Sequence, residues 1–194
     1  MLIHDFWAAY ESVWADDRQY CLVHLLRELE KVDRSNDSIE WRGLSKKLRR
    51  LIRDGIRLRK RKDFSPEKYQ SRIHLIDSRL NALAWAEYTD SDARRIRKRL
   101  DRHLDHLFTF LDRPEIAWEN NLAERMLRPA VIMRKTSQSN RSEQGAAVQS
   151  ILMSIYQTLR LRGLSPTKTI AAALKTYTAT GQLPPLPEVI VADG

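Results

Sequence analysis

Hydrophobic and polar positions in the first 32 residues change period several times, as in short strands that alternate with helices. The apolar run over residues 1–4 ends at Asp5 and predicts a strand that is entered midway. The residues that follow predict a brief helix over 6–14, a short strand over 19–23 and a helix over 24–32. This part of the chain is therefore expected to be α/β.

From about residue 33 the pattern becomes helical and stays so almost to the end of the chain, which is a change of architecture. Helices are expected over residues 38–62, 65–88 and 91–111. Ser65 and Pro66 supply an N-cap and a first helical residue for the second of these. The apolar stripes of the second and third helices predict a helical hairpin packed on the first.

Three further helices are expected after residue 120. Asn121 N-caps a helix over 122–127, which Pro129 is expected to break or kink. A basic, serine-rich loop over 134–141 precedes a long helix over 143–162 that Gly163 closes. The last helix begins at Ser165–Pro166 and reaches about residue 177, and the proline-rich tail is expected to be extended.

Charge changes this picture by indicating a polyanionic partner. The 194 residues hold 34 Lys and Arg against 25 Asp and Glu, which gives a net charge of +9. Eleven of these cations lie between Trp41 and Lys62, with Asp54 as the single acid among them. The end of this segment is either a solvated helix end or a set of phosphate contacts, formed by Arg57, Arg59, Lys60, Arg61 and Lys62.

Several residue types exclude other classes of protein. The single cysteine, Cys21, excludes an internal disulfide framework, and with His24 it forms only half of a zinc site, so a zinc protein is disfavoured. No apolar stretch approaches membrane-spanning length, so a soluble cytoplasmic protein without membrane contact is expected. His103 and His106 are expected on a solvated helix face, and core anchors are expected at Trp41, Trp85 and Trp118.

Two carboxylates are candidates for metal-assisted phosphodiester chemistry, because paired divalent cations activate the attacking oxygen and stabilise the leaving one. Hard cations prefer carboxylate ligands. Asp5 follows a predicted strand, although a turn role is the commoner explanation of such a residue. Glu124 stands three residues after Asn121, where a carboxylate also closes a capping box. The cations that follow Glu124 have no acid among them, which favours a phosphate-facing role for this carboxylate. They are Arg125, Arg128, Arg134, Lys135 and Arg141.

These residues also carry a family resemblance. The segment Asn120-Asn121-Leu122-Ala123-Glu124-Arg125, followed by Arg128-Pro129, Arg134-Lys135 and Ser142-Glu143-Gln144-Gly145-Ala146, resembles the C-terminal block of insertion sequence sixty-six family transposases. Asp5 to Tyr10 resembles the segment around that family's second catalytic Asp, and Cys21 to Arg27 resembles its Cys-x-x-His block. Leu159 to Pro166 resembles the closing helix junction, so the likeness covers most of the chain.

The resemblance implies an RNase H-like core that a basic helical insertion interrupts. The segments implied are a partial core over 1–32, the insertion over 33–117, the C-terminal helices of the core over 118–178 and a tail over 179–194. Asp5 and Glu124 become the second and third members of an acidic triad that holds Mg²⁺ or Mn²⁺. The motif is supported by Cys21, His24, Asn120 and Asn121.

Two departures from the family pattern affect this interpretation. Glu119 stands where the family often has Asp, which leaves the motif readable. The family's first catalytic Asp lies on an earlier strand and is not among these residues. The chain is then a natural remnant, one half of a split reading frame or a shortened polypeptide, and alone it is expected to be inactive and to bind no metal tightly.

The sequence therefore predicts a DNA transposase, or a fragment of one, that acts on the double-stranded ends of an insertion sequence. Partners include a separately encoded N-terminal segment or other transposase subunits, and an oligomer is compatible with the sequence. The alternative is a non-catalytic, DNA-binding remnant of such a transposase. A helical RNA-binding or scaffold protein is disfavoured.

Overall fold

A computed structural model describes residues 1–136 and 140–188 of the chain. It is mostly helical, with one small sheet among the described residues. The chain divides into two compact units, Met1–Asn121 and Leu122–Gly194. Within the described part, no helix combines the length and the apolar character needed to cross a membrane.

The first unit opens with two parallel strands, β1 (Leu2–His4) and β2 (Arg18–Tyr20). A crossover with a 3-10 helix, η1 (Ala8–Ser12), joins them. The Arg18 guanidinium holds this crossover by donating hydrogen bonds to the carbonyl oxygens of Tyr10, at 2.8 Å, and Val13. Because the strands are parallel, their carboxyl ends meet at one edge of the sheet. The first predicted strand is confirmed, and the second ends earlier than expected.

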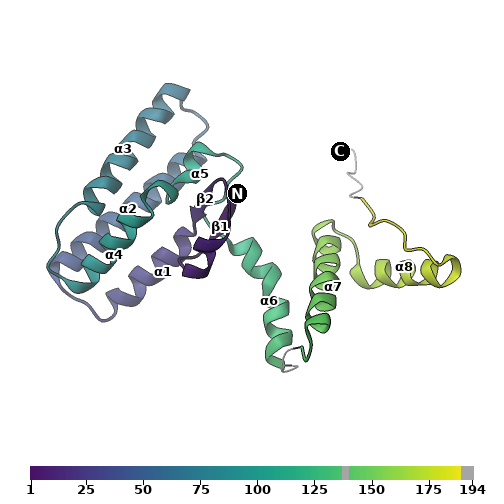
Figure 1. Cartoon of the computed structure of the whole chain (residues 1–194). Helices are drawn as coiled ribbons and strands as arrows, with labels where there is room; N and C mark the ends of the chain where they lie inside the picture. The colour runs from purple at the N-terminus through teal and green to yellow at the C-terminus, as the bar shows by residue number, and fades with distance from the viewer. Residues whose placement is uncertain (137–139, 189–194) are drawn as a thin grey trace. The chain divides into compact units, whose positions relative to one another are not determined.

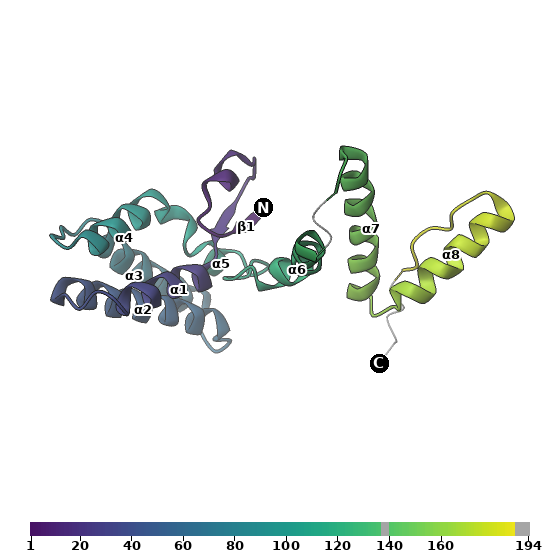
Figure 2. The same cartoon turned by 90° about the horizontal axis from the view of Figure 1, so that it is seen from below.

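Four longer helices follow in this unit: α1 (Leu22–Asp33), α2 (Ile39–Lys60), α3 (Pro66–Ala84) and α4 (Ser91–Arg102). Helices α2, α3 and α4 lie side by side, and the strand pair sits at one end of them (Figures 1 and 2). The predicted packing of a helical hairpin on the first long helix is confirmed. Its core includes Leu44, Leu48, Leu51, Ile52, Ile73, Ile76, Leu80, Ile96 and Leu100.

A polar network fixes where α2 and α4 begin. The Ser38 hydroxyl caps α2 by accepting from the Trp41 N–H at 3.1 Å, and Asp90 caps α4 by accepting from the Ala93 N–H at 2.8 Å. Ser38 also donates to Asp90 at 2.8 Å, which joins the two caps. Burial alone would raise the pKa of Asp90, but the hydrogen bonds from Ala93, Asn36 and Ser38 lower it.

The predicted helix over 91–111 is wrong in its second half. Helix α4 ends at Arg102, and a 3-10 turn, η2 (Leu104–His106), and a short helix, α5 (Thr109–Asp112), follow it. His103 leaves the helical conformation with φ −117° and ψ 21°. Its ring lies 4.2 Å from the ring of Tyr20 and is 8% exposed. The predicted solvated position of His103 is therefore wrong, because the ring packs on β2, whereas His106 is half-buried.

The three predicted tryptophan anchors have different outcomes. Trp41 is fully buried, and its indole N–H donates to Asp33 at 2.8 Å. Trp118 is partly buried against the core. Trp85 is 67% exposed, because α3 ends at Ala84 instead of near residue 88, so this prediction is wrong.

The second unit contains α6 (Asn121–Thr136), α7 (Glu143–Leu161) and α8 (Pro166–Thr180). Helix α6 continues through Pro129, against the predicted break, although proline removes one backbone donor. Gly163 has a positive φ of 72° just after α7, as its predicted closing role requires. Among the described residues of these helices, only Gln157 and Leu159 are buried. The apolar faces of this unit thus remain largely exposed.

Two glycines of α2 provide a matched test of the packing. A Cβ on Gly55 would lie 2.8 Å from Cε1 of Phe108, whose ring is held in the core, whereas a Cβ on Gly43 would meet nothing within 4 Å. We expect Gly55→Ala to lower the free energy of unfolding by about 1–3 kcal/mol. Gly43→Ala should raise it by up to about 1 kcal/mol, because alanine is the better helix former. Urea denaturation measures both, and an unchanged or more stable Gly55→Ala variant would contradict the packing.

The buried His103 ring predicts a stability loss on mild acidification. Burial lowers its pKa from the ordinary value of 6.5, and the nearby cations Arg102 and Arg99 lower it further, against the opposing carboxylate of Glu11. The unfolded chain therefore binds the proton more readily, so stability falls as the pH drops below about 6.5. Replacing His103→Phe keeps a ring against Tyr20 and should reduce this dependence, leaving the part that the buried His4 contributes.

The measurement is the urea midpoint of both proteins between pH 7.5 and 5. Loss of stability below about pH 4.5, where carboxylates titrate, should persist in the variant. An equal slope in both proteins above pH 5 would show that His103 does not cause the effect.

Candidate active site

The edge where the two strands end carries Asp5. This residue follows β1 directly and is half-buried. Its Oδ1 accepts a hydrogen bond from the Trp7 N–H at 3.0 Å, which fixes the side chain at the turn. Its other oxygen has no hydrogen-bond partner in the part of the chain that the structure describes. One oxygen of Asp5 therefore has the turn role considered from the sequence, and the other oxygen is available to a ligand.

The neighbouring strand end carries the Cys-x-x-His segment. The Cys21 N–H donates to the His4 carbonyl at 2.8 Å, so Cys21 extends the strand pairing and lies beside the start of the Asp5 turn. Cys21 is fully buried, and His24 follows in the first turn of α1. The Leu22 N–H donates to the Trp118 carbonyl at 3.0 Å. The structure thus brings Asp5, the start of α1 and the segment before Asn120 to one edge.

A buried aromatic cluster packs beside the sheet edge that carries Asp5. The His4 ring lies 4.6 Å from that of Tyr20, and the Phe6 ring stacks on Tyr20 at 4.8 Å. His4 Nδ1 is hydrogen-bonded to the backbone oxygen of Asp5 at 2.6 Å, and burial lowers the pKa of its ring. Asp5 is therefore flanked on both sides by side chains that pack on β2. In the sequence, the aromatic residues near Asp5 were the signal that could have predicted this cluster.

Glu11 completes the cluster, and sequence reasoning missed it. Its carboxylate accepts a hydrogen bond from the Tyr20 hydroxyl at 2.5 Å. This bond lowers the pKa of Glu11, while burial and the same bond raise the pKa of Tyr20. The pair ties the crossover to β2. Glu11 is thus engaged in holding the turn, and Asp5 remains the acid with an available oxygen at this edge.

The second predicted carboxylate, Glu124, lies in the second unit. Glu124 is half-buried in the first turn of α6. Because α6 begins at Asn121, Glu124 is the fourth residue of the helix, one position later than the capping box predicted from the sequence requires. The structure describes Asp5 and Glu124 each within its own unit, and Asn120 and Asn121 are the last residues of the first.

The predicted phosphate-binding cations around Glu124 are exposed on the second unit. Arg125 and Arg128 lie on α6, and Arg134 and Lys135 lie in its last turn. Arg141 is exposed after that helix. The basic loop predicted over 134–141 is thus helical through Thr136, and its residues 137–139 lie outside the described part.

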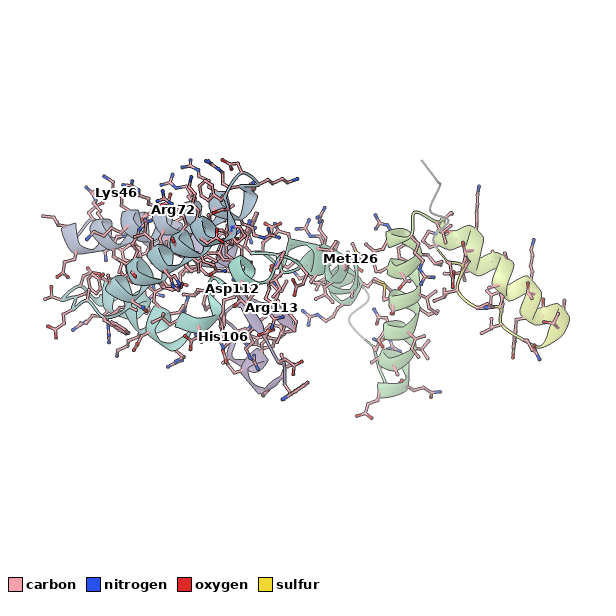
Figure 3. All side chains as sticks on the ribbon, turned by 90° about the horizontal axis from the view of Figure 1, so that it is seen from above. Lys46, Arg72, His106, Asp112, Arg113 and Met126 are labelled. Carbon is pink, nitrogen blue, oxygen red and sulfur yellow. The ribbon has the colours of Figure 1, made fainter. Side chains whose placement is uncertain are left out.

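The five cations predicted to contact DNA near the end of α2 fall into two groups. Arg59 donates to the Pro114 carbonyl at 2.6 Å, and Arg61 forms two hydrogen bonds to Asp63, both 2.7 Å. Arg57, Lys60 and Lys62 are exposed and have no ion pair with a residue that the structure describes. Figure 3 labels two other exposed cations of this unit, Lys46 on α2 and Arg72 on α3.

Comparison with known families assigns the chain. A family model described as "Transposase IS66 family" matches residues 1–148. Comparisons with curated proteins and with solved structures gave no match. The matched range is most of the chain and includes Asp5, the helices of the first unit and Glu124. The chain belongs to the IS66 family of transposases.

Proposed function

We propose that this chain carries catalytic carboxylates of a DNA transposase that cleaves and joins the ends of an insertion sequence. The observation that carries the proposal is the family match over 1–148, which spans Asp5 and Glu124 together. The parallel strand pair, with an acid directly after its first strand, is consistent with part of an RNase H-like core. Helices α2, α3 and α4, which lie within residues 33–117, would then belong to an insertion into that core.

Asp5 fits the role of a ligand for a divalent cation. One carboxylate oxygen is held by the Trp7 N–H, and the second is available to a hard cation. Mg²⁺ or Mn²⁺ would supply activation of the attacking oxygen and stabilisation of the leaving one. The backbone on both sides of Asp5 is fixed by packing on Tyr20, so the carboxylate is presented in a defined position.

Chain connectivity allows Glu124 to serve the same edge. Trp118 is hydrogen-bonded to Leu22 there, and Glu124 follows the last residue of the first unit by three positions. Six positions separate Trp118 from Glu124, and they span at most about 22 Å. The proposal includes a third carboxylate, supplied by a strand outside these 194 residues in the same polypeptide or in another transposase subunit.

The partner in this proposal is duplex DNA at the ends of the insertion sequence. The exposed cations around Glu124 would hold the phosphate backbone while the carboxylates bind metal. Arginine suits this task because its planar guanidinium matches phosphate oxygens. The group comprises Arg125, Arg128, Arg134, Lys135 and Arg141.

Substitutions that remove a carboxylate but keep its shape test the proposal. In a transposase that contains this chain, Asp5→Asn and Glu124→Gln should each abolish Mg²⁺-dependent strand cleavage and transfer, because amides are poorer ligands than carboxylates. Folding should be nearly unchanged, since an amide oxygen can still accept a hydrogen bond. The readouts are cleavage of end-bearing DNA and thermal unfolding.

Glu119→Gln provides the matched control, because it removes an acid from the same segment without touching either proposed ligand. This variant should keep its activity. If Glu124→Ala costs about 1 kcal/mol of stability while strand transfer survives, the carboxylate is structural. If the wild-type transposase that contains this chain binds DNA but shows no metal-dependent cleavage under any condition, the remnant alternative is supported.

The two groups of cations near the end of α2 make a second test possible. Each uncompensated cation that contacts a phosphate contributes about 0.9 to the slope of log K against log salt. We expect the triple variant Arg57→Gln, Lys60→Gln, Lys62→Gln to reduce the slope for duplex DNA by about 2–3. Arg59→Gln with Arg61→Gln should change it less, because these cations already have protein partners.

Fluorescence anisotropy with unrelated duplexes at several salt concentrations measures the slope, and little sequence preference is expected. A slope that is the same in wild type and the triple variant would remove this helix end from the DNA-binding surface.

A further inference from the structure

A second basic surface lies on α4, which the sequence reasoning did not assign to DNA. A groove of about 500 Å³ runs beside this helix. Its walls are predominantly polar and cationic, with one aromatic ring from the residue after Asp5. The residues that matter are Phe6, Arg94, Arg95, Lys98, Arg99 and Arg102.

The cations of this groove differ in how far they are neutralised. Arg95 and Arg99 both form ion pairs with Glu28, and Arg95 also reaches Asp92 at 3.3 Å. Arg94, Lys98 and Arg102 form no hydrogen bond or ion pair with the described part of the chain. The groove therefore presents three uncompensated positive charges together with two that the protein already uses.

These three cations form a regular row. They are spaced four residues apart, so they lie on one face of α4 at successive turns, with a rise of about 6 Å between neighbours. The row is about 12 Å long, and each strand of B-form DNA carries one charge per roughly 3.4 Å of the helix axis. A DNA backbone laid along the row would meet several phosphates, so the spacing suits an extended polyanion better than a small anion.

The aromatic ring does not offer a platform for a base. Phe6 stacks on Tyr20 with an interplanar angle of 15°, and the Arg99 guanidinium lies 4.8 Å from the centroid of the Phe6 ring. Phe6 instead anchors Arg99 between itself and Glu28. The groove thus offers charge and hydrogen-bond donors, which recognise the phosphate backbone and not base identity.

Phe6 also places the groove beside the candidate catalytic acid. Asp5 is the adjacent residue, and both belong to the first unit. We propose that the α4 groove binds the phosphate backbone of duplex DNA next to the position where Asp5 acts, with Arg94, Lys98 and Arg102 as the contacting residues. This inference rests on the proposed role of Asp5, and it assigns the helical segment a direct part in placing the substrate strand.

A radical probe at position 5 tests the proposal independently of catalysis. In the full chain, Asp5→Cys provides an attachment point for an iron-EDTA reagent, and wild type controls for background because its single cysteine, Cys21, is fully buried. The DNA is an end-labelled duplex at saturating protein. We expect cuts in the bound duplex above the wild-type background, spread along the DNA because phosphate contacts carry little sequence preference.

The triple variant Arg94→Gln, Lys98→Gln, Arg102→Gln in this background should lose those cuts and show a salt slope smaller by about 2–3. The matched control removes the same charge from exposed positions of α2, with Lys46→Gln, Lys47→Gln and Arg50→Gln. This control should keep the DNA cuts made from position 5, even if its overall affinity for DNA falls.

Cuts that survive in the α4 variant, cuts that disappear equally in both variants, or bound DNA that is never cut from position 5 would each overturn the assignment. Circular dichroism of all variants checks that they are folded. If Asp5→Asn retains transposase activity while the cuts depend on α4, the proposed role of Asp5 fails but the DNA groove stands.

Discussion

The first unit depends on one buried amide that joins its sheet to its helices. Gln19 on β2 is fully buried, and its side-chain N–H groups donate to the carbonyl oxygens of Leu107, at 2.8 Å, and Tyr20, at 2.7 Å. Its amide oxygen accepts from the Phe110 N–H at 3.1 Å. Buried polar groups are costly when unpaired, so these bonds strongly specify where the chain returns after the helices. The Thr109 hydroxyl reinforces the return by donating to the Arg18 carbonyl at 2.7 Å.

This junction explains why the third expected helix is broken. A continuous helix over 91–111 would have to run straight past β2, whereas Gln19 requires the backbone at Leu107 and Phe110 to face the strand. The chain therefore leaves the helix at His103, whose ring fills the space beside Tyr20. Phe108 then packs close to Gly55, which only a residue without a side chain permits. The break also brings the end of α4, and thus its row of cations, next to Phe6.

The sequence predicted the elements whose signal is local. Helix caps at Ser65 and Gly163, the strand before Asp5 and the periodic stripes of α3 and α4 were visible because they depend on neighbouring residues. The positions of His103 and Trp85 were not, since they depend on contacts or helix ends that no short window contains. The long apolar pattern after residue 91 is compatible with both a helix and a broken helix, and Gln19, far away in sequence, decides between them.

The sequence predicted the acids of the candidate site better than the cations that are available to bind DNA. Asp5 was found because an acid after a strand is a recognisable pattern, and its open oxygen agrees with that choice. The basic residues were ranked by their density in the sequence, which favoured the end of α2. Density does not show which cations are already engaged: Arg59 donates to a carbonyl oxygen, and Arg61, Arg95 and Arg99 form ion pairs within the protein.

Affinity for a polyanion depends on uncompensated charge, because a paired arginine must lose a protein contact before it gains a phosphate. The relevant quantity for each surface is therefore the number of free cations that a single DNA backbone can reach. By that measure the row on α4 equals the end of α2, although α2 contains nine basic residues and α4 contains six. The row on α4 also has the better position. Its groove is lined by Phe6, the residue next to Asp5, whereas among the described residues the end of α2 has no comparable link to Asp5.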